Sequence, residues 1–213
     1  VKRISSGGSF GSGIQMNSAA PVGVALALEA RRPVKLCLTR EEDMHDHCKY
    51  PSWIQLKLGA KKDGTLAAGQ MKVVVDIGAH NTQAYSLLGC MAGWWVSLYE
   101  LPHLHYEGIA VYTNKVPACA MQGFGNPQVN FAVESMMDML AEKLKMDPIE
   151  LRLKNYVGLG KTFWGQGPTV RSVIRSCGVE EMLTKGPDLI GWDRREEKTE
   201  EKGPVRRGVG MAR

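Results

Sequence analysis

The amino-acid sequence predicts an α+β protein, because helical and strand patterns occur in the same chain. From Gln128 on, apolar residues recur at gaps of three and four, which is the period of a helix with one buried face. Residues 53–58 alternate apolar and polar side chains. Asp63-Gly64-Thr65 separates them from a second extended stretch over residues 66–77, so a β-hairpin is predicted here. The chain has 213 residues, 44% of them hydrophobic, which is enough for a sizeable core.

Composition excludes several classes of protein. The formal net charge of +5 is modest and the basic residues are scattered, so no nucleic-acid-binding face is predicted. No apolar run is long enough to span a bilayer. The cysteines are odd in number, far apart and form no Cys-x-x-Cys pair, so neither a disulfide framework nor a zinc or iron–sulfur site is indicated. We expect free thiols in a reducing compartment, the cytoplasm.

The chain begins with a glycine- and serine-rich loop. Val1 to Ile4 is predicted as the end of a strand, Ser5 to Gly13 as the loop, and Met16 to Ala30 as a helix. The loop lacks the Lys-Ser or Lys-Thr of a phosphate-binding loop and the spacing of a dinucleotide fingerprint. Taken alone, it is a simple strand–helix turn.

The next segment combines a predicted strand, a capped helical turn and a pair of histidines. Residues 32–38 are predicted as a short buried strand, and Thr39 to Met44 as a capped turn. His45, His47 and Cys48 are interpreted as surface or pocket-wall residues, since no complementary cluster completes a metal site. The same interpretation is given to the histidines at 103 and 105, which begin a strand predicted to run to residue 113.

A second glycine-rich loop, Ala120 to Pro127, leads directly into the amphipathic helix. Free backbone N–H groups at a helix start suit an anion, so the loop is either an oxyanion cradle or a tight turn. Another helix is predicted from Pro148, with Asp147 as its N-cap. Beyond it, residues 158–167 are predicted as a polar connector and residues 170–184 as a helix.

The second loop and its surroundings resemble the molybdopterin-binding subunit of the xanthine dehydrogenase and aldehyde oxidase family. That family carries Thr-Asn…Pro, Ala-Phe-Arg-Gly-Phe-Gly-x-Pro-Gln, Glu-x-x-Met-Asp and Asp-Pro…Leu-Arg-x-x-Asn in this order. The corresponding segments here are Thr113-Asn114…Pro117, Ala120 to Gln128, Glu134 to Asp138, and Asp147-Pro148…Leu151-Arg152…Asn155. The first loop is similar to the family's Gly-Gly-Gly-Phe-Gly-Gly-Lys. Residues 206–212 resemble the family's Arg-Gly-Ile-Gly-Met-Ala segment, which implies a strand there.

The resemblance implies a mixed β-sheet with packed helices, one lobe of a two-lobed molybdopterin-binding region. Residues 1–155 would form this lobe, and residues 156–213 a connector, a helix and the start of the second lobe. The implied cofactor-binding residues lie on the two loops: Gly8, Ser9, Phe10, Gly11, Ala120, Met121, Gln122 and Gly123. The implied substrate pocket contains Phe10, Ile14, Lys49 and Gln122.

The implied chemistry is the oxidation or hydroxylation of a small-molecule substrate with water as oxygen source. Electrons would pass from molybdopterin, in its plain or cytosine dinucleotide form, to [2Fe–2S] clusters and FAD on partner domains or subunits. The family's catalytic Glu lies near the end of the complete subunit, so no catalytic residue and no protein ligand to a metal is assigned here. We expect this chain alone, a fragment without the remaining lobe, to be inactive.

Two departures from the family pattern bear on the substrate. Gln122 stands where the common pattern has Arg, so a charge is lost at that position. Gly13-Ile14 stands where purine-oxidising members often have Lys-Glu, which favours an aldehyde, aromatic or N-heterocyclic substrate over xanthine. A non-catalytic cofactor-binding or scaffold module of the same fold is the alternative function. An α+β domain without cofactor would require both loops to be plain turns.

Overall fold

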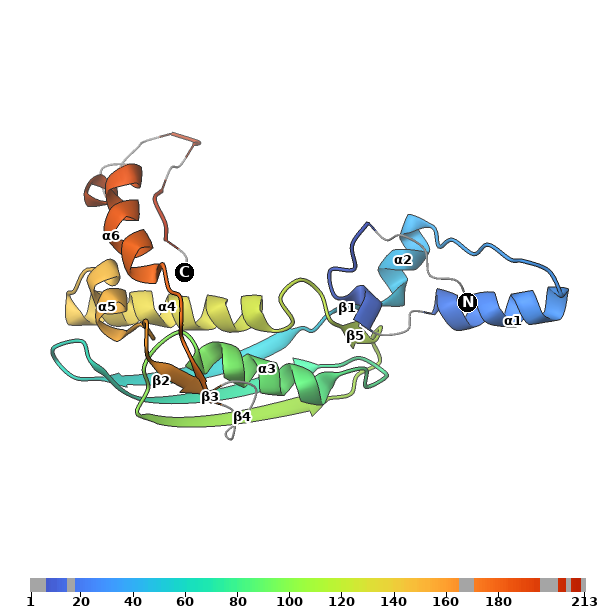
Figure 1. Ribbon diagram of the computed structural model, residues 1–213, viewed down its shortest axis with the longest axis horizontal. Coiled ribbons are helices and arrows are strands. Elements are labelled where there is room, and N and C mark those ends of the chain that lie inside the picture. Colours follow the sequence, from blue (N-terminus) through green and yellow to red (C-terminus); the bar gives the residue numbers. More distant parts are fainter. Residues whose placement is uncertain (1–6, 15–17, 165–170, 196–202, 206–207, 212–213) are drawn as a thin grey trace. The chain divides into compact units, whose positions relative to one another are not determined.

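The computed structural model of the chain describes residues 7–14, 18–164, 171–195, 203–205 and 208–211 (Figure 1). The helices are η1 (Ser12–Ile14), α1 (Ala19–Ala30), α2 (Arg40–Asp46), α3 (Ala84–Val96), α4 (Asn126–Leu144), α5 (Pro148–Asn155), α6 (Val179–Ile190) and η2 (Trp192–Arg194). The strands are β1 (Cys48–Lys49), β2 (Ser52–Ala60), β3 (Leu66–Asp76), β4 (His103–Val111), β5 (Ala118–Cys119), β6 (Thr162–Trp164) and β7 (Arg171–Val173).

Within the described residues the strands form three sheets. The largest has the order β2-β3-β4, β1 pairs with β5 in parallel, and β6 pairs with β7 in antiparallel orientation. Helices combined with mixed strand directions confirm the predicted α+β class. The chain divides into two compact units, which are described separately. Unit 1 contains residues 1–56, 70–94 and 105–129, and unit 2 contains residues 57–69, 95–104 and 130–213.

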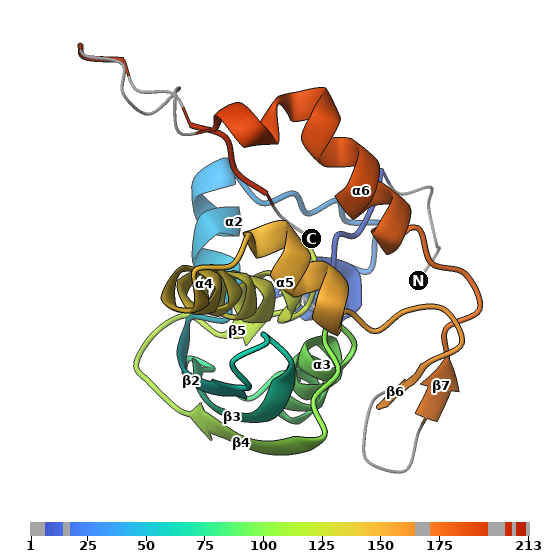
Figure 2. The same ribbon diagram turned by 90° about the vertical axis from the view of Figure 1, so that its left-hand side faces the viewer.

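The core of unit 1 forms where β3 and α3 pack together. Met71, Val73 and Val75 alternate along β3 and are fully buried, as the period of two residues requires for one face of a sheet. Both ribbon views show α3 beside these strands (Figures 1 and 2), and it contributes the buried Leu87 and Met91. This packing supports the second glycine-rich loop, which follows β5 directly.

In unit 2, hydrogen bonds hold helix α5 at both ends. Asp147 caps this helix by accepting hydrogen bonds from the amides of Ile149 and Glu150 at 2.8 and 3.4 Å, as the sequence predicts. At its other end the buried Asn155 accepts from the Leu66 amide at 2.8 Å and donates to the Gly64 carbonyl at 2.9 Å. One amide side chain thus fixes the turn between β2 and β3 to the helix.

Several predicted elements are confirmed and others are wrong. The hairpin, the capped turn at Thr39 and the helix after the second loop are present. Residues 32–38 form no strand, because no strand in the described part pairs with them, and Val34 and Leu36 are each 40% exposed. A short apolar segment alone does not supply the ladder of hydrogen bonds that makes a strand.

The predicted helix over residues 170–184 is replaced by a strand and a later helix. β-Branched Val173 ends β7, and α6 begins only after Gly178. Gly186 lies inside α6, and the helix ends at Gly191, whose φ of +67° is the left-handed cap that favours glycine. The predicted connector over residues 158–167 contains β6.

Some predictions fall at or beyond the limits of the described residues. Val1 to Ile4 and residues 15–17 lie outside them, so α1 is described only from Ala19. Of the predicted strand over residues 206–212, residues 208–211 are described and are not a strand, and the rest lies outside. In the described part of the chain, no helix combines the length and apolar character needed to cross a bilayer.

Candidate functional site

The two glycine-rich loops, far apart in the sequence, meet in unit 1. The amide of Gln122 donates a hydrogen bond to the carbonyl of Phe10 at 2.8 Å. A Cβ atom added to Gly11 would stand 2.6 Å from the carbonyl oxygen of Ala120, so only glycine allows this approach. We call residues 8–14 and 120–125 the paired loops.

The second of the paired loops has an unusual backbone. Four consecutive residues have positive φ: Gln122 (33°), Gly123 (102°), Phe124 (35°) and Gly125 (89°). The left-handed region is costly for residues with a side chain, so Gln122 and Phe124 require support from their surroundings. At Gly125 a Cβ atom would stand 2.4 Å from Cγ of Met91, which shows how closely the loop packs on α3.

Side chains from other parts of unit 1 hold this loop by its carbonyl groups. Nζ of Lys49 donates to the carbonyl of Gln122 at 3.1 Å, and Nε1 of Trp94 donates to the carbonyl of Phe124 at 3.3 Å. The ring of Tyr50 contacts the ring of Phe124 edge to face, with centroids 6.4 Å apart. The loop conformation is therefore imposed by the fold.

The predicted cofactor-binding residues divide into exposed and buried groups. Gly8, Ser9 and Phe10 are exposed, with Phe10 at 66%, as are Gln122 and Gly123. Ala120 is buried, whereas Gly11 and Met121 are half-buried. Within the first loop, Oγ of Ser9 accepts a hydrogen bond from the Gly13 amide at 2.9 Å. The exposed members form a surface on which a ligand can lie.

The predicted substrate-pocket residues are only partly brought together. The backbone of Gln122 links two of them: its amide donates to the Phe10 carbonyl, and its carbonyl accepts from Lys49. Ile14 is exposed, and its amide donates to the Gly11 carbonyl of its own loop at 3.1 Å. In the described part of the chain the carboxamide of Gln122 makes no hydrogen bond, so it is available to a ligand.

Tyr50, Thr82, Trp94 and Gln128 support the second loop without having been predicted. The Tyr50 hydroxyl and the Thr82 hydroxyl are 2.6 Å apart, and Thr82 donates to the carbonyl of Ala118 at 2.6 Å. Nε2 of Gln128 donates to the Tyr50 carbonyl at 3.1 Å, while its Oε1 is buried without a partner in the described residues. Only Gln128 lay within a quoted motif. The others belong to segments whose contacts arise from the fold.

Asp76 anchors the approach to the second loop. Its carboxylate accepts hydrogen bonds from Nζ of Lys115 at 2.8 Å, Oγ1 of Thr113 at 2.6 Å and the Gly78 amide at 2.9 Å. These contacts, with Lys115 the largest cause, lower the pKa of Asp76 to about 2. The segment that carries the Thr-Asn…Pro motif is thus attached, through Thr113 and Lys115, to the end of β3.

The thiols near the site remain protonated at neutral pH. Burial raises the pKa of Cys119 to about 11, and burial also raises the pKa of Cys48. Nδ1 of His47 lies 2.8 Å from Oδ2 of Asp46. Among the described residues, no three His, Cys, Asp or Glu side chains gather closely enough to hold a metal ion.

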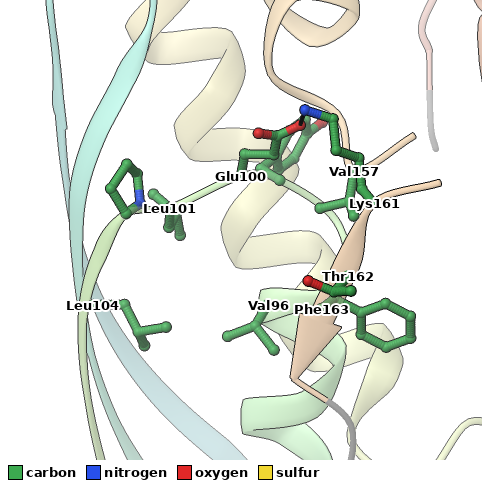
Figure 3. A pocket seen from close by; sticks show the side chains of 10 residues that line it. Val96, Glu100, Leu101, Leu104, Val157, Lys161, Thr162 and Phe163 are labelled. Atoms are coloured by element: carbon green, nitrogen blue, oxygen red, sulfur yellow. Dashed lines mark ion pairs between the residues drawn. The ribbon is translucent and has the colours of Figure 1, made fainter. Parts of the chain in front are cut away.

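Unit 2 contains a cavity of about 300 Å³ whose lining includes none of the predicted site residues (Figure 3). Val96, Leu101, Leu104 and Val157 give it apolar walls. Its two charged groups, Lys161 and Glu100, pair with each other at 3.3 Å, as Figure 3 shows. Because these charges satisfy each other, the cavity does not indicate a particular ligand.

Comparison with known proteins shows the family of the chain. Residues 1–156 match the molybdopterin cofactor-binding domain family. The chain belongs to this family. It is 36% identical over 182 residues to the xanthine dehydrogenase molybdenum-binding subunit of Escherichia coli O157:H7, covering 84% of this chain and 24% of that protein. It is 40% identical over 170 residues to the aldehyde oxidoreductase of Megalodesulfovibrio gigas, covering 78% and 18%.

A solved structure shows the same relationship. The aldehyde oxidoreductase from Desulfovibrio gigas superposes with a TM-score of 0.78 and 34% sequence identity, covering 93% of this chain and 21% of that one. This likeness confirms the predicted fold as part of a molybdopterin-binding region. The chain spans about a quarter or less of the length of these relatives.

The paired loops fit a flat, polar cofactor such as molybdopterin. Gly11 keeps the two loops in contact where a side chain would separate them, and Gln122 and Gly123 are exposed beside it. At the start of the helix that follows, α4, the Asn126 amide donates to the Gly123 carbonyl at 2.8 Å and Pro127 has no N–H, so few backbone N–H groups there are free for an anion. The unpartnered Oε1 of Gln128 is a buried acceptor on the first turn of that helix.

Proposed function

We propose that the paired loops form part of the molybdopterin-binding site of a molybdenum hydroxylase catalytic subunit. Gly8, Ser9, Phe10 and Gly11 would line one side, and Ala120, Met121, Gln122 and Gly123 the other. The observation that carries this proposal is the 2.8 Å hydrogen bond from the Gln122 amide to the Phe10 carbonyl. It joins two loops that both lie within residues 1–156, which match the molybdopterin cofactor-binding domain family.

Each residue would contribute binding and orientation. When bound, the cofactor would supply the redox chemistry at molybdenum, as cofactors generally do. The glycines allow the backbone to approach the cofactor closely. Phe10 and Ile14, both exposed, would give the substrate pocket an apolar wall, and the Gln122 carboxamide would offer an uncharged hydrogen-bonding group.

The proposed reaction is oxidation of an aldehyde, aromatic or N-heterocyclic substrate, with water as oxygen source. Similarity to an aldehyde oxidoreductase and to a xanthine dehydrogenase subunit supports this class. Electrons would leave to [2Fe–2S] and FAD partners. No catalytic residue of this chain is assigned, so turnover would require the remaining lobe of the subunit.

The proposed organisation keeps residues 1–155 as the molybdopterin-binding lobe and residues 156–213 as the connector and start of the second lobe. A cytoplasmic location is part of the same proposal. It is supported by the five cysteines, all free thiols, which suit a reducing compartment. The pterin would be either the plain or the cytosine dinucleotide form.

Molybdenum and pterin content tests this proposal. The full-length subunit is purified from its native host with its co-purifying chains, and metal and pterin are measured per chain. About one molybdenum per chain, together with iron–sulfur partners, is expected from stoichiometric binding of a cofactor. Native material without molybdenum would contradict the proposal and favour the scaffold function.

A further inference from the structure

The backbone of Gln122 is held on both sides of its Cα atom. Its N–H donates to the Phe10 carbonyl at 2.8 Å, and its carbonyl accepts from Nζ of Lys49 at 3.1 Å. The first contact joins the paired loops to each other. The second ties them to β1, which belongs to neither loop. Lys49 is therefore placed to control the conformation of the second loop.

Lys49 extends from a rigid part of unit 1. It pairs with Cys119 in the parallel ladder of β1 and β5, one residue before the loop begins. The next residue, Tyr50, is 2% exposed, and its carbonyl accepts a hydrogen bond from Nε2 of Gln128 at 3.1 Å. Because the backbone on both sides of Lys49 is held in place, its side chain reaches the second loop from a fixed position.

The backbone conformation of the second loop requires stabilising contacts of this kind. Gln122 has a φ of +33° and is followed by three more residues with positive φ. A non-glycine residue keeps this conformation only where its surroundings stabilise it. Lys49 provides a charged donor, and hydrogen bonds from charged donors are stronger than those between neutral groups.

We propose that Lys49 is the positioning residue of the molybdopterin-binding loop. It acts through the Gln122 carbonyl, whose peptide group also contains the Gly123 N–H, and so decides how that N–H would face the cofactor. This differs from the expectation that Lys49 is a cation that meets the substrate. The inference rests on the proposed function.

The test compares the Lys49→Met variant of the full-length holoenzyme with wild type. Methionine keeps the apolar stem and removes the donor, so we expect molybdenum and pterin to be lost about tenfold faster, the effect of one charge-assisted hydrogen bond. The molecules that remain loaded should keep the wild-type KM. Wild-type cofactor retention with a raised KM for an anionic substrate would overturn the proposal and assign Lys49 to substrate binding.

Two further variants separate positioning from a general effect of substitution. Lys49→Arg keeps a charged donor and should retain cofactor within about threefold of wild type, a fraction of the effect of losing the bond. A loss equal to that of Lys49→Met would overturn the role of the hydrogen bond. Lys62→Met, at an exposed position between β2 and β3, is the matched control and should behave as wild type.

A measurement on the apo-subunit makes the test independent of cofactor loading. The rate of amide hydrogen exchange over residues 121–125 should rise about tenfold in Lys49→Met, because the loop opens more often once the hydrogen bond from Lys49 is removed. Unchanged exchange would overturn the proposal. Wild-type protein without molybdenum would instead contradict the proposed function, and the inference would fall with it.

Discussion

The paired loops of unit 1 and the surroundings of Arg152 in unit 2 use polar groups in opposite ways. In the loops, polar backbone is held in costly conformations and left exposed. Around Arg152, a fully buried guanidinium contacts Glu134 at 2.7 Å and Asp138 at 2.8 Å. Tyr99 adds a 2.7 Å hydrogen bond to Glu134.

The difference separates residues that bind from residues that stabilise. The Arg152 side chain is 0% exposed and satisfies its donors within the protein, so it has nothing to offer a ligand. The exposed Gln122 carboxamide has no partner in the described part of unit 1. Both regions lie within motifs shared with the family, so a family motif alone does not identify a binding residue.

Removing Arg152 should have the largest effect on stability. Arg152→Met leaves the Glu134 carboxylate, 12% exposed, without its charge partner, and breaking a buried pair typically costs about 3–5 kcal/mol. Denaturant unfolding of the full-length subunit measures this loss. The Asp138→Asn variant is the control, since that side chain is 56% exposed and should lose less than about 1 kcal/mol. Equal losses in both variants would contradict the central position of Arg152.

Placing a methyl group between the paired loops should have the next largest effect. Gly11→Ala puts a Cβ atom 2.6 Å from the Ala120 carbonyl at a φ of +108°, and strain of this kind costs about 1–3 kcal/mol. Molybdenum content should fall more than stability does, because the loops separate where the cofactor would lie. Gly89→Ala, on the exposed side of α3 with no atom within 4 Å, is the matched control. Full cofactor content in Gly11→Ala would argue against binding between the loops.

Asp76 should make the approach to the second loop sensitive to acid. Its folded pKa of about 2 lies below the ordinary value of 3.8, so its ionised form stabilises the folded state at any pH above about 4. That contribution is lost as pH falls from about 4 to about 2. Acid unfolding of Asp76→Asn should show a weaker pH dependence in this window than wild type, with the exposed Asp188→Asn as control. Identical profiles would show that Lys115 and Thr113 do not stabilise the charged form.

The elements that could be predicted from the sequence are those with a long period or a local start signal. Helix α4 has a buried face long enough for its periodicity to be read, and Asp147-Pro148 is a local start signal for α5. The motifs also singled out two loops that the structure brings into contact. Periodicity and helix caps depend on residues that are close in the sequence, so they do not require knowledge of the tertiary contacts.

The contacts that assemble the paired loops could not be predicted from pattern. β1 and β5 are two residues long, too short for a strand period, yet their pairing carries Lys49 to the second loop. Trp94 contacts the loop, and Thr82 contacts β5 just before it, from segments that have no motif. The strand predicted over residues 32–38 failed for the converse reason, because in the described part of the chain no strand pairs with this apolar segment.

Gln122→Ala should have the smallest effect on stability and the most specific effect on function. The substitution removes only an exposed carboxamide, while the backbone contacts to Phe10 and Lys49 remain, so the free energy of unfolding should change by less than about 0.5 kcal/mol. If the side chain orients substrate in the loaded enzyme, KM should rise with cofactor content unchanged. Asn130→Ala changes a carboxamide on α4 and serves as the comparison: its Oδ1 is buried without a partner in the described residues. A Gln122→Ala enzyme with wild-type KM would restrict the role of this residue to its backbone, and the loop would then bind cofactor without reading substrate.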